Sequence, residues 1–218
     1  MNGPMPQRYD CSDTSARSAG IDAAVTALGQ GRLVVLPTDT VYGVGADAFD
    51  PQAVAHLLAA KGRGRHKPSP VLVGSTDGLD GLVSELPDRA AELIEAFWPG
   101  GLTLVLRHRP TLSWDLGETG GTVAVRMPDH PLTLELLAAA GPMAVSSANL
   151  TDRPSPEDCD AALGMLGDSV SVYLDGGPTA GPVSSSIVDL TGDAPVLVRA
   201  GVLSAAELRR VVPDLIVP

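Results

Sequence analysis

The chain of 218 residues is 44% hydrophobic and 19% charged, and its formal net charge is −11 at pH 7. These proportions are typical of a folded soluble protein with one domain or at most two small ones, and not of a disordered chain. The acidity argues against a general nucleic-acid coat and against a membrane-surface protein, because both depend on positive charge. Two Trp, three Tyr and two Phe also offer little surface for base stacking.

Helical and strand patterns alternate along the sequence. A first helix is predicted over residues 15–28, because apolar side chains recur on one side of it. The short apolar run of residues 32–36 predicts a strand that is buried on both faces. Asp50 can cap a second helix, Pro51 fits its first turn, and Lys61 lies at its end. Further strands are expected at residues 70–73, 102–107, 122–126, 143–145, 170–174, 186–190 and 196–199, and further helices at residues 87–97, 131–140, 156–163 and 205–211.

This mixed order predicts an α/β fold, with flanking helices around one twisted mixed sheet. Residues 1–14 are expected to form an N-terminal tail and residues 15–218 a single domain. The N-terminus has no apolar signal core, and no run of about 18 apolar residues could cross a membrane. Cys11 and Cys159 form neither a disulfide framework nor a metal knuckle, so we expect two free thiols in the cytoplasm.

The positive charges are unevenly distributed. Residues 61–67, the basic segment, hold both lysines of the chain, Lys61 and Lys67, together with Arg63 and Arg65, out of fifteen Lys and Arg residues in all. Such a cluster in an acidic protein suggests a local anion site, although charged runs are commonly only solvated loops. The residues alone leave both interpretations open.

Standard nucleotide and catalytic motifs do not account for the sequence. A P-loop is excluded because neither lysine is followed by Ser or Thr. Residues 43–48 fit G-x-G-x-x-A, but they do not clearly open a helix and lack the acidic residue about 20 positions further on, so a dinucleotide site is a weak alternative. The sequence contains no G-x-S-x-G elbow and no H-E-x-x-H helix, and its four histidines are too scattered for a metal cluster.

Three polar segments rich in Gly or Pro follow or precede predicted strands, at residues 37–45, 146–156 and 176–186. Each alone is more often a turn or a cap. Ligand sites of α/β proteins gather outside strand ends. Hydroxyl and amide groups at three such positions, together with the basic segment, therefore indicate a binding site.

These segments together resemble the YrdC/Sua5 family of threonylcarbamoyl-AMP synthases. The resemblance covers roughly residues 20–203, with several motifs in the family's order. It rests on residues 37–45, Lys61-Gly62-Arg63, Ser147-Ala148-Asn149, Pro154-Ser155-Pro156, residues 185–189 and Arg199-Ala200-Gly201. It implies a YrdC-like domain, a twisted α/β sheet around a large open cavity, in the family's short form without an additional C-terminal domain.

The resemblance further implies a nucleotidyltransferase that converts L-threonine, bicarbonate and ATP into L-threonylcarbamoyladenylate and pyrophosphate. ATP would bring Mg2+ with it, and no tightly bound cofactor is implied. The product would serve threonylcarbamoyl modification of adenosine 37 of tRNA, through the proteins of a tRNA-threonylcarbamoyltransferase complex. Contact with tRNA itself would be weak at most, and no contact with a membrane is expected.

Motif positions imply the site residues. Lys61 and Arg63 are expected to be catalytic and to hold the triphosphate. ATP contacts are expected at Lys61, Arg63, Lys67, Thr122, Ser147, Asn149, Ser155 and Arg199. L-threonine contacts are expected at Thr40, Arg126, Val145 and Ser185. No residue is expected to be a metal ligand. Four sites depart from the family pattern: Gly64 stands where Pro is common, Leu72 where some members have a substrate-contacting His, Thr151-Asp152 where Ser-Gly is common, and Ser184 where Glu is frequent.

Two other functions compete with this interpretation. A non-catalytic RNA-binding module would use the same basic segment, although the net charge of −11 disfavours tight binding to RNA. A related carbamoyl-adenylate enzyme with a different acceptor would use similar chemistry, although such relatives usually carry extra domains.

Overall fold

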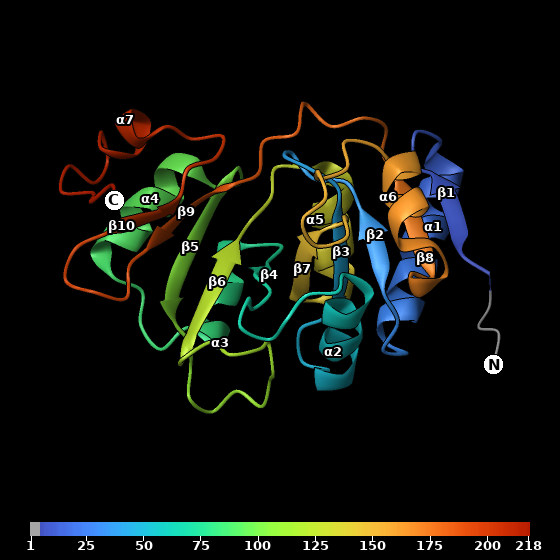
Figure 1. Ribbon diagram of the computed structural model, residues 1–218, viewed down its shortest axis with the longest axis horizontal. Helices are drawn as coiled ribbons and strands as arrows, with labels where there is room; N and C mark the ends of the chain where they lie inside the picture. The colour runs from blue at the N-terminus through green and yellow to red at the C-terminus, as the bar shows by residue number, and fades with distance from the viewer. Residues whose placement is uncertain (1–4) are drawn as a thin grey trace.

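The computed structural model describes residues 5–218 and contains one sheet of ten strands (Figure 1). The strands are β1 (Gln7–Asp10), β2 (Val34–Leu36), β3 (Gly43–Asp47), β4 (Val71–Leu72), β5 (Leu102–Arg107), β6 (Thr122–Arg126), β7 (Met143–Ser147), β8 (Val172–Asp175), β9 (Ser186–Asp189) and β10 (Val196–Arg199). They lie in the order β1-β8-β2-β3-β7-β4-β6-β5-β9-β10. The pairs β1–β8, β8–β2, β4–β6 and β5–β9 are parallel and the others antiparallel, which confirms the expected mixed α/β sheet.

Seven α-helices flank this sheet within the described residues. They are α1 (Thr14–Leu28), α2 (Pro51–Ala60), α3 (Leu79–Leu82), α4 (Asp88–Phe97), α5 (Pro131–Ala140), α6 (Cys159–Leu166) and α7 (Ala205–Leu208). Local sequence sets their ends: the Asp13 carboxylate accepts from the Ala16 N–H at 2.8 Å, and Ser204 and Glu207 form a capping box. Between residues 5 and 218, no helix is both long and apolar enough to span a membrane.

Side chains from the sheet pack into two apolar cores, one on each face. Along β2, Val34 and Leu36 belong to the smaller core with α1 and α5, whereas Val35 belongs to the larger core. Along β8, Tyr173 likewise lies in the larger core and its two neighbours lie in the smaller one. Alternate side chains of a strand point to opposite faces, so this end of the sheet is covered on both sides.

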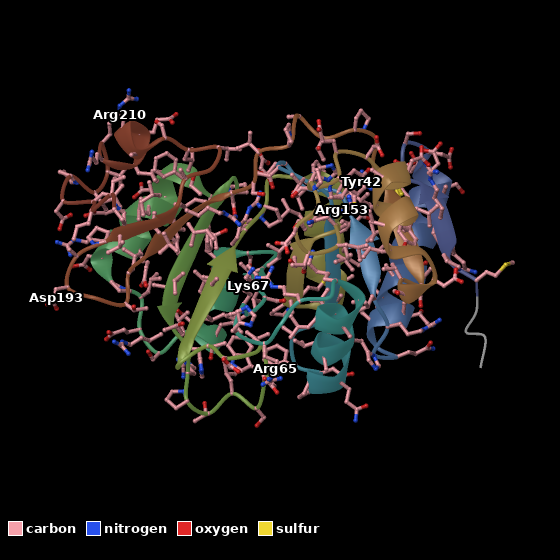
Figure 2. The ribbon with its side chains drawn as sticks, in the orientation of Figure 1. Tyr42, Arg65, Lys67, Arg153, Asp193 and Arg210 are labelled. Carbon is pink, nitrogen blue, oxygen red and sulfur yellow. The ribbon has the colours of Figure 1, made fainter. Side chains whose placement is uncertain are left out.

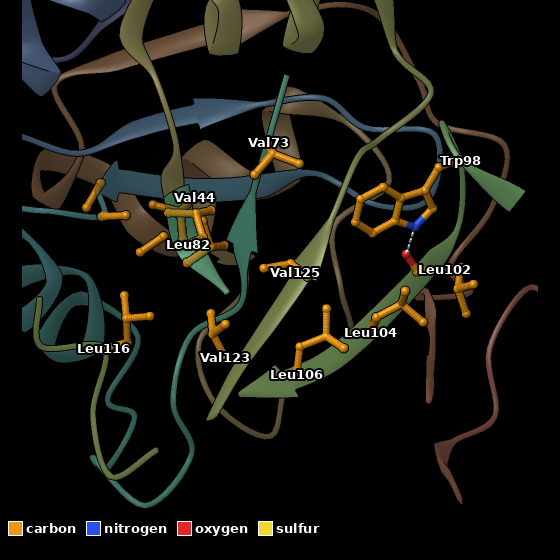
Figure 3. Packing of buried hydrophobic residues seen from close by; sticks show 14 of the residues in the cluster. Val44, Val73, Leu82, Trp98, Leu102, Leu104, Leu106, Leu116, Val123 and Val125 are labelled. Atoms are coloured by element: carbon orange, nitrogen blue, oxygen red, sulfur yellow. Dashed lines mark hydrogen bonds between the residues drawn. The ribbon is translucent and has the colours of Figure 1, made fainter. Parts of the chain in front are cut away.

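At the other end of the sheet, around β5, one face packs into a core and the opposite face lines a cavity. Leu102 and Leu104 of β5 lie in the larger core with α4, and the Trp98 indole N–H donates to the Leu102 carbonyl at 2.8 Å (Figure 3). Thr103 and Val105 alternate with these leucines and point to the opposite face, where they line a cavity. The two-residue period of β5 therefore separates a core from a candidate site.

The expected tail of residues 1–14 contains β1, so that expectation is wrong for residues 7–10; residues 1–4 lie outside the described part. β1 pairs in parallel with β8, and the Arg8 guanidinium bridges Asp175 and Asp160, each at 2.6 Å. A four-residue edge strand shows too little alternation to be recognised as a strand from its pattern.

Helix boundaries also differ from the sequence prediction, by three residues at α6 and at α7. The helix expected at residues 156–163 begins at Cys159, because the Asp158 carboxylate caps it by accepting from the Ala161 N–H at 2.7 Å. The last helix, expected to reach residue 211, ends at Leu208.

Residues 43–47 of the glycine pattern form β3, which the sequence pattern does not predict as a strand. A Cβ at Gly43 would stand 2.7 Å from Val145 Cγ1, and one at Gly45 would stand 2.6 Å from Met143 Cε. The glycines therefore let the β7 side chains lie over β3. Because the segment is a strand paired with β2 and β7 and opens no helix, it is not the strand-to-helix turn of a dinucleotide site.

Leu104→Ala should lower the free energy of unfolding by about 2–5 kcal/mol, because it leaves a void in the core under the sheet. Val105→Ala, one residue away on the cavity face, should cost less than half as much. Urea unfolding followed by circular dichroism measures both losses. Equal losses would contradict the assignment of the two faces.

Candidate active site

A cavity of about 350 Å3 lies on the sheet face formed by β4, β5, β6, β7 and β9. Its floor is apolar where these strands contribute Leu72, Val105, Ala124, Val145 and Ile187. Its walls carry hydroxyl and guanidinium groups from Thr38, Thr40, Arg63, Thr103, Arg126, Ser146, Ser147, Ser184, Ser185 and Arg199. An apolar floor with a few converging polar groups is typical of a small-molecule site.

Arg63 reaches the cavity from the segment that follows α2. Asp50 caps α2 with Pro51 in its first turn, and Gly62 turns the chain out of the helix with φ of +60°. The Arg63 guanidinium donates to the carbonyls of Lys67 at 2.6 Å and Pro68 at 3.0 Å. It also donates to the hydroxyl of Ser146 at 3.1 Å. Three of its five N–H donors are thus engaged, and two remain for a ligand.

Lys61 is buried beneath the loop that follows β7. Its ammonium donates to the carbonyls of Ser147 and of Asn149, the latter at 2.6 Å. Its own carbonyl accepts from the N–H and the hydroxyl of Thr151, at 2.9 and 2.8 Å. Burial, and secondarily the charge of Arg63, lower the Lys61 pKa to about 8. The residue therefore joins the end of α2 to the loop of residues 147–151 with one ammonium proton to spare.

Arg126 lies at the end of β6 and is almost fully buried. Its guanidinium donates to the Gly100 carbonyl at 2.9 Å, to the Thr40 hydroxyl at 3.0 Å and to the Asp39 carboxylate at 2.6 Å. Burial lowers the Arg126 pKa, and the charge of Asp39 and its hydrogen bond oppose that shift. Asp39 is itself fixed by the Asp129 N–H at 3.1 Å.

Arg199 is the most exposed of the three cavity arginines. Its guanidinium donates twice to the Ser185 carbonyl, at 2.9 and 2.8 Å, and once to the Ser185 hydroxyl at 2.9 Å. Partial burial lowers the Arg199 pKa, and the charges of Arg126 and Arg63 lower it further. Arg199 is thus close enough to Arg126 and Arg63 to be repelled by both, which favours an anionic ligand beside it.

Seven of the predicted site residues line the cavity: Thr40, Arg63, Arg126, Val145, Ser147, Ser185 and Arg199. The others lie outside the lining. Lys61 is below the loop, and Thr122 stands at the far end of β6, where its hydroxyl donates to Thr119 O at 2.8 Å. Lys67 is exposed and lies in the central part of the view in Figure 2.

The two remaining predicted nucleotide contacts, Asn149 and Ser155, lie in the loop after β7. Ser155 is half-buried in it. Asn149 is buried, and its amide group donates to the carbonyls of Leu150 and Arg153, both at 2.8 Å. The Asn149 Oδ1 atom is buried and accepts no hydrogen bond from residues 5–218. A buried acceptor without a donor is costly, so this atom is an unsatisfied polar group of the loop.

Several polar residues of the cavity region carry no role in the sequence prediction, among them Asp39 and Thr103. Asp39 belongs to a recognised motif, but only the fold shows that it pairs with Arg126, 87 positions away. Thr103 lies in the cavity wall, where its hydroxyl contacts the Ser185 hydroxyl at 2.8 Å. Its signal in the sequence is a single hydroxyl within the apolar run of residues 102–106.

The residues from 5 to 218 contain no cluster of three or more His, Cys, Asp or Glu side chains suited to a metal ion. The carboxylate at the cavity, Asp39, is already paired with Arg126. These residues do not fit a metal centre held by the protein.

Residues 26–201 match the Sua5/YciO/YrdC family model, whose description is telomere recombination. A Mycobacterium leprae (strain TN) protein assigned as a threonylcarbamoyl-AMP synthase is 56% identical over 207 residues, which cover 95% of this chain and 94% of the relative. A threonylcarbamoyl-AMP synthase of Bacillus subtilis (strain 168) is 37% identical over 202 residues, which cover 92% of this chain and 58% of the relative.

Two solved structures share the fold. P. abyssi Sua5 complexed with L-threonine matches with a TM-score of 0.87 and 37% identity, over 91% of this chain and 58% of that one. E. coli YciO matches with a TM-score of 0.81 and 24% identity, over 95% of this chain and all of that one.

The buried Lys61 predicts a pH-dependent difference in stability between the wild type and Lys61→Met. The unfolded lysine keeps its proton up to a pKa of about 10.5, whereas the native lysine loses it near 8, so the unfolded state binds more protons in this window. Raising the pH from 7 to 10 should therefore stabilise the wild type relative to Lys61→Met, on the order of 1–3 kcal/mol. Urea unfolding at both pH values measures it, with the exposed Lys67→Met as control. A difference that does not change with pH would refute the burial of the charge.

Proposed function

This chain belongs to the YrdC/Sua5 family of threonylcarbamoyl-AMP synthases, which serve the t6A modification of tRNA, and we propose that the cavity binds ATP and L-threonine side by side for this reaction. The observation that supports the proposal most is the set of three arginines around one apolar floor, with Lys61 beneath the adjoining loop. In a protein with a net charge of −11, this is a concentrated site for a polyanion.

The reaction needs charge control more than a protein nucleophile. The free amine of L-threonine condenses with bicarbonate: a C–N bond forms, the C–OH bond of bicarbonate breaks, and water leaves as the carbamate is formed. A carbamate oxygen then attacks the α-phosphorus of ATP, the bond to the β-phosphate oxygen breaks, and pyrophosphate leaves. Nucleophile and leaving group are both anionic, so positioning and fixed positive charge can provide most of the acceleration.

We assign the triphosphate to the side of the cavity formed by Arg63. The two unused N–H donors of Arg63 can bind phosphate oxygens. The buried Lys61 ammonium has one proton that is not engaged, and we assign it to the same phosphate group. Lys67, Thr122, Ser147, Asn149, Ser155 and Arg199 remain the proposed further contacts to ATP.

We assign L-threonine to the side formed by Thr40, Arg126, Val145 and Ser185, all of which line the cavity. Three donors of Arg126 are engaged, and two remain to bind the substrate carboxylate. The pairing with Asp39 and the bonds to Gly100 and Thr40 hold this guanidinium in place.

Mg2+ would enter with ATP as the counterion of its phosphates. Because the described residues form no carboxylate cluster, phosphate and water oxygens would be its principal ligands. We further propose that the enzyme acts in the cytoplasm and that tRNA-threonylcarbamoyltransferase proteins consume its product. Direct binding of tRNA would be weak, because the net charge is −11.

Pyrophosphate release from ATP and bicarbonate should depend on L-threonine. An enzyme-coupled phosphate assay after pyrophosphatase treatment measures it, with glycine, L-serine and L-valine as alternative amino acids. Release that is equally fast without L-threonine would contradict the proposal. Tight tRNA binding at physiological salt without any turnover would favour an RNA-binding module instead.

Arg63→Ala should reduce kcat/KM for ATP by about 100-fold or more, because two charge-assisted contacts to phosphate are lost. Arg65→Ala is the matched control, since Arg65 lies in the same segment but pairs with Asp115 at 2.7 Å on the surface. The control should stay within about threefold of the wild type. Equal losses in the two variants would show that total charge, and not the position of Arg63, carries the effect.

A further inference from the structure

Thr103 is a buried polar residue of β5, and both of its neighbours in the sequence are leucines. Its neighbours Leu102 and Leu104 are fully buried in the larger core, and Thr103 itself is 2% exposed. Within residues 5–218 its hydroxyl has one hydrogen-bond partner, the Ser185 hydroxyl at 2.8 Å. The reaction proposed above uses Ser185 but gives Thr103 no role.

The direction of this hydrogen bond follows from counting protons. A hydroxyl donates one hydrogen bond and accepts two. Both residues line the cavity, and Thr103 is 2% exposed against 5% for Ser185. If Ser185 donated to Thr103, the proton left without an acceptor among the described residues would be that of the less exposed Thr103. If Thr103 donates to Ser185, the proton left for the cavity is that of the more exposed Ser185. The second arrangement is favoured because it leaves the more accessible proton for a ligand.

This arrangement fills both acceptor sites of the Ser185 hydroxyl. One is occupied by Thr103 and the other by Arg199, whose guanidinium donates to Ser185 Oγ at 2.9 Å. The proton of Ser185 is then the only part of the hydroxyl left for a ligand. The Arg199 guanidinium also donates two hydrogen bonds to the Ser185 carbonyl. Ser185, in the loop before β9, therefore connects Thr103 of β5 to Arg199 of β10.

We propose that Thr103 is a positioning residue that directs the Ser185 hydroxyl proton into the cavity and so restricts its partner to a hydrogen-bond acceptor. In the reaction proposed above, on which this inference rests, that partner is an anionic oxygen of the substrate: a carboxylate, carbamate or phosphate oxygen. An ammonium group could not replace it, because Ser185 has no acceptor site left.

The test compares Thr103→Val with Thr103→Ser. Valine keeps the shape of threonine and removes the donor, whereas serine keeps the donor and removes a methyl group. Thr103→Val should lower kcat/KM for L-threonine about tenfold, as expected for one lost contact to an anion, and Thr103→Ser should stay within about threefold of the wild type. A thermal unfolding scan of each variant confirms that the protein is folded at the assay temperature.

A double-mutant cycle with Ser185→Ala separates the positioning role from a general effect on packing. If Thr103 acts through Ser185, Thr103→Val should cause no further loss in the Ser185→Ala background. Additive losses, a wild-type rate for Thr103→Val, or equal losses in Thr103→Val and Thr103→Ser would each overturn the inference.

The wild-type assay distinguishes failure of this inference from failure of the proposed function. If the wild type releases no pyrophosphate with L-threonine, the function is wrong. The same cycle is then measured by calorimetry as binding of ATP and of L-threonine, where a loss in Thr103→Val that vanishes in the Ser185→Ala background still supports the positioning role. Equal binding by all four proteins would overturn it.

Discussion

The cationic side chains at the cavity are held chiefly by main-chain carbonyl oxygens. Lys61 and Arg63 donate to carbonyls of two loops, and Arg199 donates twice to a single carbonyl. A carbonyl dipole satisfies N–H donors without cancelling a full charge. Among the described partners of these groups, the one carboxylate is Asp39, on Arg126. The cavity therefore keeps a concentrated positive charge, although the protein as a whole is strongly acidic.

This arrangement depends on leaving part of one sheet face free of helices. Towards the β1 end, alternate side chains of β2 and β8 enter apolar cores on both faces. At the β9 end, the leucines of β5 still enter a core, but the residues between them line the cavity. The same strand thus supplies both the packing that stabilises the fold and the groups that contact a ligand. A rigid strand positions such groups more precisely than a mobile loop does.

The sequence predicts the parts of this molecule whose cause is local. The cap at Asp50 and the apolar run of β2 were recognisable, as were the motifs around the cavity. β3 was not, because its glycines fit a strand only under the side chains of β7, which come about 100 residues later. The pairing of Asp39 with Arg126 and the burial of Lys61 are tertiary contacts of the same kind. Residue type and spacing indicate which groups a site contains, and only the fold decides which of them meet.

The mutual repulsion of the cavity arginines has a consequence for the end of the catalytic cycle. Partial burial and neighbouring charges already oppose the protonated form of Arg199. A polyanion that binds between these groups would offset the repulsion. In the proposed reaction, pyrophosphate carries away much of the charge that ATP brings in, so its departure restores the repulsion. The same positive charge that assists bond breaking at the α-phosphorus would therefore oppose the release of pyrophosphate.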